Sequence, residues 1–167
     1  MLSIRQAKPE DASVLAEAER VISQLPGFLV SKPHELTDER FRQTIIELSE
    51  SKSGRYLVAE MGNEVAGHAF LEAMSLEAIS HVVRLTIAIH PGWQGKGIGQ
   101  ALLQTLIAWA KEAKTIEKIE LSVRATNLAA QKLYLKLGFI EEGRLSRRIK
   151  ISEDQYLDDV LMGLWVK

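Results

Sequence analysis

The 167-residue chain contains no cysteine. It therefore has no disulfide, no thiolate metal ligand and no cysteine nucleophile, and this composition suits a reducing cytoplasm. An excess of charge of one sign is also lacking, because 21 Lys and Arg residues balance 22 Asp and Glu residues. The formal net charge of -1 argues against a dedicated nucleic-acid binder.

Long apolar runs are missing as well. No uninterrupted apolar stretch approaches the roughly 20 residues of a membrane-spanning helix, and residues 1–12 lack the apolar core of a signal peptide. The four histidines, at positions 34, 68, 81 and 90, show no metal-ligand spacing. We therefore expect a cytoplasmic protein that uses no metal, no membrane and no nucleic acid.

The pattern of apolar residues predicts one mixed domain over residues 1–167. Hydrophobic residues make up 46% of the chain, which is enough for one domain with a sizeable core. Alternating runs predict strands, and apolar residues at helical spacing predict helices. The expected order is β-α-α-β-β-β-α-β-α-β-β, with helices near 9–22, 38–50, 97–113 and 128–137. Strands are expected at 2–7, in a hairpin over 55–74, and at 81–90, 118–123, 139–151 and 155–166.

Four glycines fall within eight residues of the stretch HPGWQGKGIGQALL, residues 90–103. This loop follows an expected buried strand and directly opens a helix, so free backbone N–H groups and the positive end of the helix dipole face it. A tight turn alone is one explanation of such glycines. The other is a concave nest of amides for a diphosphate, built on the pattern of Gln94, Gly97 and Gly99.

Two common nucleotide loops do not fit this stretch. A P-loop requires Gly-Lys-Ser/Thr, but Lys96 is followed by Gly97, so no hydroxyl is available for magnesium. The dinucleotide fingerprint requires a third glycine, and Gln100 occupies that position.

The loop and a second stretch together resemble the GCN5-related N-acetyltransferase (GNAT) family. Residues 94–99 match the signature Gln/Arg-x-x-Gly-x-Gly/Ala, and residues 85–91 resemble the family's fourth strand. Residues 127–139 resemble its second signature, with Asn127, Ala130, Tyr134, Gly138 and Phe139 at the matching positions. The resemblance implies an α/β (α+β) fold, with a mixed, mainly antiparallel central sheet of about seven strands flanked by about four helices.

The resemblance also implies acetyl-CoA as the cosubstrate. It assigns the pantetheine arm to main-chain groups that mimic an added strand, namely those of Ile87, Ala88 and Ile89. It assigns the diphosphate to the helix start formed by Gln94, Gly95, Lys96, Gly97, Ile98 and Gly99, with Gln100 beside it. Asn127 is expected either to cap its helix or to bind the cofactor.

Tyr134 is the best catalytic candidate. Its phenol has a reference pKa near 10, so it stays protonated at neutral pH and can donate to a developing thiolate. The family's strand glutamate aligns with Val83, so that base does not carry over. His81 shares a strand face with Val83 by alternation and is the candidate base, although a plain strand-end histidine explains it too. The remaining base candidates are Glu72, His34 and Glu35.

The acceptor is predicted to be the primary amine of a small molecule, such as an amino acid or a polyamine. A protein N-terminus or lysine, and a catalytically silent acyl-CoA-binding module, are the alternatives. A loop over residues 24–36 that closes the site would favour a small molecule, and an open groove would favour a protein. Arg144, Arg148 and Lys150 predict a solvated edge strand or an anionic partner, whereas Asp158 and Asp159 favour a cationic amine. The family resemblance also admits a homodimer.

Overall fold

The strands form one seven-stranded sheet in the order β1-β2-β3-β4-β5-β7-β6. All neighbouring strands are antiparallel except β4 and β5, which run parallel. The predicted mixed, mainly antiparallel sheet is therefore confirmed. In the computed structural model, which describes all 167 residues, the strands are β1 Leu2–Gln6, β2 Arg55–Met61, β3 Glu64–Ala73, β4 Val82–Ile89, β5 Lys118–Arg124, β6 Ile140–Ser152 and β7 Gln155–Trp165.

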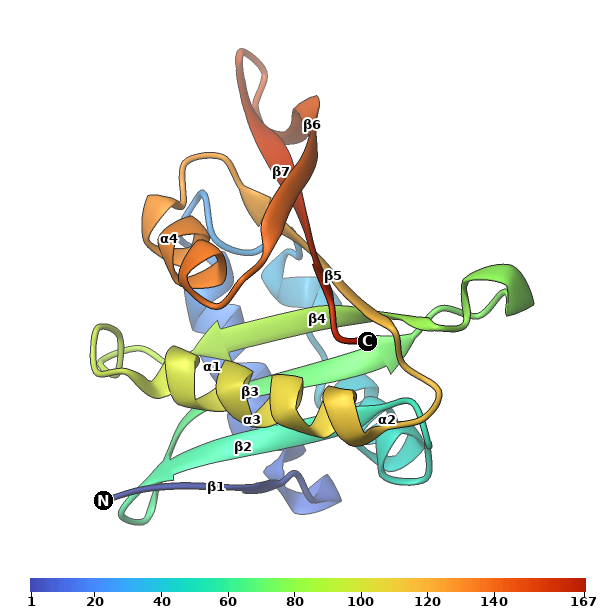
Figure 1. Cartoon of the computed structure of the whole chain (residues 1–167). Coiled ribbons are helices and arrows are strands. Elements are labelled where there is room, and N and C mark those ends of the chain that lie inside the picture. Colours follow the sequence, from blue (N-terminus) through green and yellow to red (C-terminus); the bar gives the residue numbers. More distant parts are fainter.

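Helices cover both faces of the sheet (Figure 1). The four α-helices are α1 Ala12–Ser23, α2 Asp38–Ser49, α3 Ile98–Glu112 and α4 Leu128–Lys136. Three short 3-10 turns, Pro9–Asp11, Pro33–Glu35 and Glu77–Ile79, lie in the connections. The first predicted helix begins later than expected, because its proline-led turn over residues 9–11 is a 3-10 turn and the α-helix starts at Ala12.

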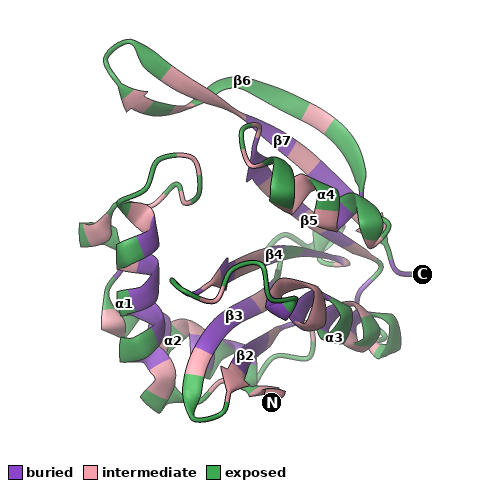
Figure 2. Cartoon of the chain, turned by 90° about the vertical axis from the view of Figure 1, so that its left-hand side faces the viewer, coloured by how far each residue is buried: buried purple, intermediate pink, exposed green.

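The alternation of side chains along β2 creates two separate cores. Leu57 and Ala59 belong to the larger core, which also contains the apolar stripe of α3. Tyr56 and Val58 face the other way, into a smaller core with residues of α1 and α2. Successive strand residues point to opposite faces, so α1 and α2 cover one face of the sheet and α3 covers the other. Figure 2 shows the buried stripe on the inner side of α1.

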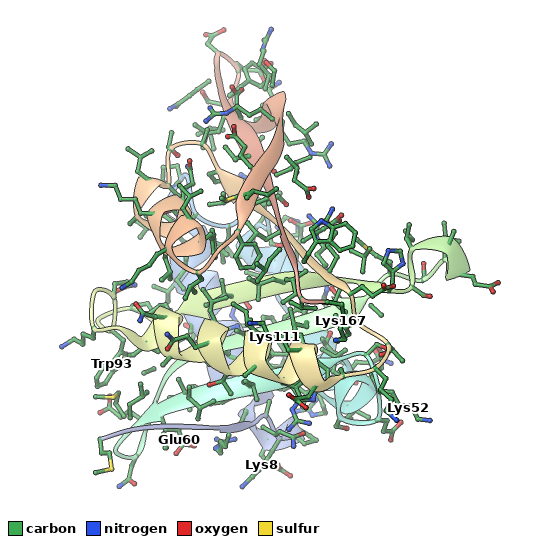
Figure 3. All side chains as sticks on the ribbon, in the orientation of Figure 1. Lys8, Lys52, Glu60, Trp93, Lys111 and Lys167 are labelled. Atoms are coloured by element: carbon green, nitrogen blue, oxygen red, sulfur yellow. The ribbon has the colours of Figure 1, made fainter.

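The last residue of the chain fixes the end of α3. The Lys167 ammonium donates to the carbonyls of Ala110 (3.0 Å), Lys111 (2.9 Å) and Ala113 (3.0 Å), and Figure 3 labels Lys167 and Lys111 side by side. A cation at a helix C-terminus satisfies free carbonyls and the helix dipole. None of the helices combines the length and the apolar character needed to span a bilayer.

Candidate active site

Strands β4 and β5 are paired over only part of their length. The parallel register covers three residue pairs, from Val82 opposite Lys118 to Arg84 opposite Glu120, although both strands continue well beyond them. In Figure 1, β4 runs on toward the glycine loop while β5 and β7 rise away from it. The second half of β4 therefore has a strand on one side only.

The direction of the main-chain groups on β4 follows from three hydrogen bonds. His90 N–H donates to Ala66 of the β3 side (2.9 Å), and Val82 C=O accepts from Met74, also on that side (3.1 Å). His81 C=O, one position out of phase, accepts instead from Glu117, at the start of β5 (2.9 Å). Residues along an antiparallel ladder alternate between facing the partner and facing away.

This alternation divides the three residues that were predicted to hold the pantetheine arm. The main-chain groups of Ile87 and Ile89 face the side that β5 has left. Those of Ile87 and the N–H of Ile89 are free there to pair with an extended ligand, whereas the Ile89 C=O accepts from the Gln94 side chain. Those of Ala88 face β3, opposite His68 in the register. Two of the three predicted residues thus offer main-chain donors and acceptors to the gap.

The start of α3 carries open backbone donors. Its first backbone hydrogen bond runs from Ala101 N–H to Gly97 C=O (3.1 Å), so the N–H groups of Ile98, Gly99 and Gln100 have no partner within the helix. Gly97 has φ 80° and Gly95 has φ 73°, a left-handed conformation that glycine adopts without strain. The space where each would carry a side chain is empty within 4 Å. This helix start is an open cradle for an anion.

The polar residues of the loop have individual partners. The Gln94 amide accepts from Gly92 N–H (3.1 Å) and donates to Ile89 C=O (3.4 Å), which ties the loop to the end of β4. The Lys96 ammonium lies 5.6 Å from the centre of the Trp93 ring, and Figure 3 labels Trp93 in this loop.

Helix α4 lies beside the same helix start. The Lys136 ammonium donates to the Gln100 side chain (2.9 Å), which places a cation near the open N–H groups. The Asn127 side chain accepts from Ala130 N–H (3.3 Å) and caps α4. Of the two roles predicted for Asn127, the structure contains the cap.

Tyr134 is buried on α4, with 7% of its surface exposed. Its ring contacts the Phe139 ring at a centroid distance of 5.7 Å. Burial raises the pKa of Tyr134 to about 12, against an opposing effect of the Arg124 guanidinium. The Tyr134 hydroxyl makes no hydrogen bond within the chain. The fully buried side-chain polar atom without a partner is the Tyr56 hydroxyl alone.

A pocket of about 240 Å³ lies on the opposite face of the sheet, under α1 and α2. Strands β2, β3 and β4 form its floor through Tyr56, Phe70, Glu72 and Thr86. Thr86 lies on β4 beyond the residues that pair with β5 and directly before Ile87. The pocket therefore adjoins the part of β4 that has a strand on one side only. The other lining residues are Glu19, Ser31, Leu36, Arg40, Phe41 and Thr44.

The predicted base His81 does not line this pocket. It precedes β4 at the end opposite the glycine loop, six residues before Ile87, or roughly 20 Å along the strand at 3.3 Å per residue. Alternation also places it on the α3 face, whereas the pocket is on the α1 and α2 face. The base role of His81 stays a prediction.

The other base candidates differ in position. Glu72 lines the pocket, whereas His34 and Glu35 lie in the 3-10 turn beside it, and the Glu35 side chain is bound to Lys32 N–H (2.8 Å). Glu19 was not among the predicted site residues, but it is buried on α1 and lines the pocket. A signal was present, because Glu19 occupies the apolar stripe of α1, four residues after Leu15.

The charged residues near the C-terminus have structural partners. Asp159 is buried and pairs with the Arg124 guanidinium at 2.5 Å, and Asp158 accepts from Arg147 N–H (2.7 Å). Strand β6 is the edge of the sheet, as the solvated-edge interpretation expected. Its register shifts between Leu145 and Ile149, so simple alternation of the basic residues along it does not hold.

A mixed sheet that parts beside a glycine-rich helix start is the arrangement of an N-acetyltransferase. The sequence profile of the acetyltransferase (GNAT) family matches residues 21–139. The chain belongs to this family and is an N-acetyltransferase by class.

Individual relatives agree with this assignment. The structure is similar to the acetyltransferase of the GNAT family from Streptococcus pneumoniae, with 30% identity, a TM-score of 0.90 and 99% of each chain covered. It shares its fold with yncA from Salmonella typhimurium, solved with its cofactor acetyl-CoA, at 21% identity and a TM-score of 0.90, with 100% of this chain and 95% of that chain covered. The L-amino acid N-acetyltransferase AaaT of Escherichia coli is 28% identical over 109 residues, which span 65% of this chain and 67% of that protein.

Proposed function

We propose that the protein transfers the acetyl group of acetyl-CoA to the primary amine of a small molecule, with Tyr134 as the general acid. The proposal rests on one observation: a candidate cosubstrate site and a candidate acceptor pocket both adjoin β4. The open helix start and the free main-chain groups of Ile87 and Ile89 lie toward the gap beside β4, and the pocket at Thr86 lies on the other face.

The residues present fit acetyl-CoA. The open N–H groups at the start of α3 suit a diphosphate, and Lys136 adds a cation beside them. The free half of β4 suits the amide-bearing arm of the cosubstrate. When bound, acetyl-CoA supplies an activated acetyl thioester. The N–H of Ile87 or Ile89 then faces the thioester oxygen and stabilises the charge that develops there.

Tyr134 suits the acid role because burial keeps it protonated. With a pKa raised to about 12, its phenol holds its proton through the neutral range. Its hydroxyl, which makes no hydrogen bond within the chain, then donates that proton to the departing thiolate. A purely structural tyrosine in the core is the alternative explanation of this residue.

The loop over residues 24–36 favours a small acceptor. Ser31 and Leu36 from this segment line the pocket, and Phe28 C=O accepts from the Arg124 guanidinium at the end of β5 (3.3 Å). The loop is thus docked across the site rather than leaving an open groove. The pocket of about 240 Å³ is also smaller than typical drug-sized sites.

The pocket carries charges of both signs. Glu19 and Glu72 suit an ammonium group, and Arg40 suits an anionic group on the same molecule. An amino acid or a related zwitterion matches this lining, in keeping with the similarity to an L-amino acid N-acetyltransferase. Acetylation of a protein N-terminus or lysine is the second candidate, and it requires the loop to move.

Calorimetry with acetyl-CoA and a thiol-release assay test the proposal together. We expect acetyl-CoA to bind, and thiol to be released with small amines in preference to peptides. The Tyr134→Phe variant should lose about 100-fold in kcat while it keeps its affinity for acetyl-CoA. Tyr156→Phe, on the exposed end of β7, is the matched control. Full activity of Tyr134→Phe across pH would remove the acid assignment.

A further inference from the structure

Glu19 of the acceptor pocket is one end of a buried chain of three titratable side chains. His68 Nε2 lies 2.8 Å from Glu19 Oε2, and His68 Nδ1 lies 2.8 Å from His90 Nε2. His68 is fully buried, and only 4% of His90 and 6% of Glu19 are exposed. Burying a polar side chain costs free energy unless it is hydrogen-bonded. The hydrogen bonds between these three side chains offset that cost.

The chain connects two hollows on the surface. Glu19, on α1, lines the acceptor pocket together with Thr86. His90, just after β4, lines a separate hollow with Pro91 and Trp93 at the glycine loop. His68, on β3, joins them through the core. The three groups are bound to one another and are not arranged as metal ligands.

The hydrogen bonds of the chain run in one unbroken series from Glu19, through both ring nitrogens of His68, to His90. An imidazole can accept a proton at one ring nitrogen and release one from the other. A proton that Glu19 takes up therefore has a path through His68 to His90.

We propose that this Glu19–His68–His90 chain accepts the proton of the acceptor amine, with Glu19 as the group that contacts the amine. This inference rests on the proposed function. The N–H bond of the ammonium group breaks, and the electron pair that stays on nitrogen forms the bond to the acetyl carbon. The C–S bond then breaks as Tyr134 protonates the departing thiolate, and the second proton that the nitrogen loses in becoming an amide restores Tyr134. The proton enters the link between Glu19 and His68, and a proton leaves from His90 to water in the hollow beside Trp93.

The chain then returns to its starting state. After the products leave, water refills the acceptor pocket. His90 takes a proton back from the hollow, and Glu19 releases one into the open pocket. One turnover thus places one proton, that of the amine, in water. His68 and His90 act through Glu19 and are positioning residues.

The surroundings of the chain favour this role. His68 is stacked on Tyr56 (5.9 Å) and meets the edge of Phe41 (6.1 Å), so its ring is held in place. Tyr56 also lines the acceptor pocket, and its hydroxyl is buried without a partner in the chain. Burial and the neighbouring Glu19 carboxylate raise the pKa of Tyr56 well above its usual value, so it does not compete for the proton.

Other charged side chains line the two hollows at the ends of the chain but are not hydrogen-bonded to it. Glu72 and Arg40 line the acceptor pocket beside Glu19, and Glu17 lines the hollow at His90. Glu72 is exposed and lies opposite Arg84 in the strand register. It is the competing carboxylate, without a connection to the histidines.

Steady-state kinetics of Glu19→Gln against pH test the proposal, once the wild type has been shown to acetylate an amine. Glutamine preserves the shape of the side chain and a hydrogen bond to His68 but cannot take up a proton. We expect kcat/KM at pH 7 to fall about 100-fold and then to rise about tenfold for each pH unit, as the free amine becomes available. Calorimetry should show unchanged affinity for acetyl-CoA.

Further variants separate a base from a structural role. The exposed Glu47→Gln on α2 is the control for loss of one charge and should keep the wild-type pH profile. Glu72→Gln, in the lining of the acceptor pocket, should raise KM for the amine without a steep rise of kcat/KM with pH. His90→Asn should lower kcat about tenfold with unchanged affinity for acetyl-CoA. If Glu19→Gln does not fold, His90→Asn carries the test. A wild-type pH profile in either variant, or the steep pH rise in Glu72→Gln instead, would overturn the proposal. Lack of wild-type activity would overturn the proposed function itself.

Discussion

At the scale of single residues, Arg124 and Asp159 form a buried ion pair. The two side chains face each other from neighbouring strands, in direct register, with only 7% and 5% of their surfaces exposed. Arg124 also donates to the carbonyls of Phe28 (3.3 Å) and Ser122 (3.2 Å). The pair therefore holds the loop over residues 24–36 against the end of β5, where the sheet parts.

Replacing Asp159 by asparagine should leave the Arg124 charge buried and uncompensated. We expect the free energy of unfolding to fall by about 3 kcal/mol, since breaking one side of a buried pair is strongly destabilising. The neighbouring Asp158→Asn is the control and should cost less than about 1 kcal/mol. Urea denaturation of both variants measures the difference. Equal losses would show that Arg124 does not depend on its partner.

At the scale of elements, the start of α3 determines whether the cosubstrate binds. Gly97 occupies the N-cap position with φ 80°, and the open N–H groups follow it directly. An alanine there would be strained and would place a methyl group in the cradle. Gly62, in the turn between β2 and β3, has φ 64° and equally open surroundings.

These two glycines make a matched pair for an experiment. Gly97→Ala and Gly62→Ala should each lower stability by about 1 kcal/mol. Only Gly97→Ala should weaken acetyl-CoA binding, by about tenfold or more. Calorimetry on both variants, with thermal unfolding as the measure of strain, gives the comparison. Equal affinities would show that this helix start does not hold the diphosphate.

The helices, the strands and the glycine loop were predictable because their signals are local. Apolar periodicity located each helix, and the turn at Gly62 marked the hairpin. The parting of β4 from β5 was not predictable, because strand pairing depends on residues more than thirty positions apart. The distance of His81 from the pocket was not predictable for a related reason: alternation gives the face of a strand on which a residue lies, and it does not say how far along the strand a given group lies.

The buried chain could not be predicted from the sequence for the same reason. Glu19, His68 and His90 come from three different elements, and each by itself resembles an ordinary core or strand-end position. Only the tertiary fold brings their side chains together.

At the scale of the whole molecule, burial of a neutral histidine links stability to pH. Desolvation, together with the neighbouring His68, lowers the pKa of His90 to about 3 from its usual 6.5. The unfolded chain therefore binds a proton at this position below about pH 6.5, whereas the folded chain does not until about pH 3. Stability is present in full above pH 6.5 and is lost as the pH falls toward 3.

The variant His90→Asn should remove this part of the acid sensitivity. Between pH 7.5 and pH 4.5 the wild type should lose roughly 2 to 3 kcal/mol more than the variant, at about 1.4 kcal/mol for each pH unit below 6.5. Urea denaturation at the two pH values gives both losses. Parallel losses in the two proteins would mean that His90 is not neutral when folded.

The most direct test of the account is the identification of the acetylated product. The protein is incubated with acetyl-CoA and a mixture of free amino acids, small amines and short peptides, and the products are identified by mass spectrometry. The account predicts acetylation of small amines, foremost zwitterionic ones, with one thiol released for each acetyl group transferred. Acetylation of the peptides alone, or binding of acetyl-CoA without any transfer, would contradict it.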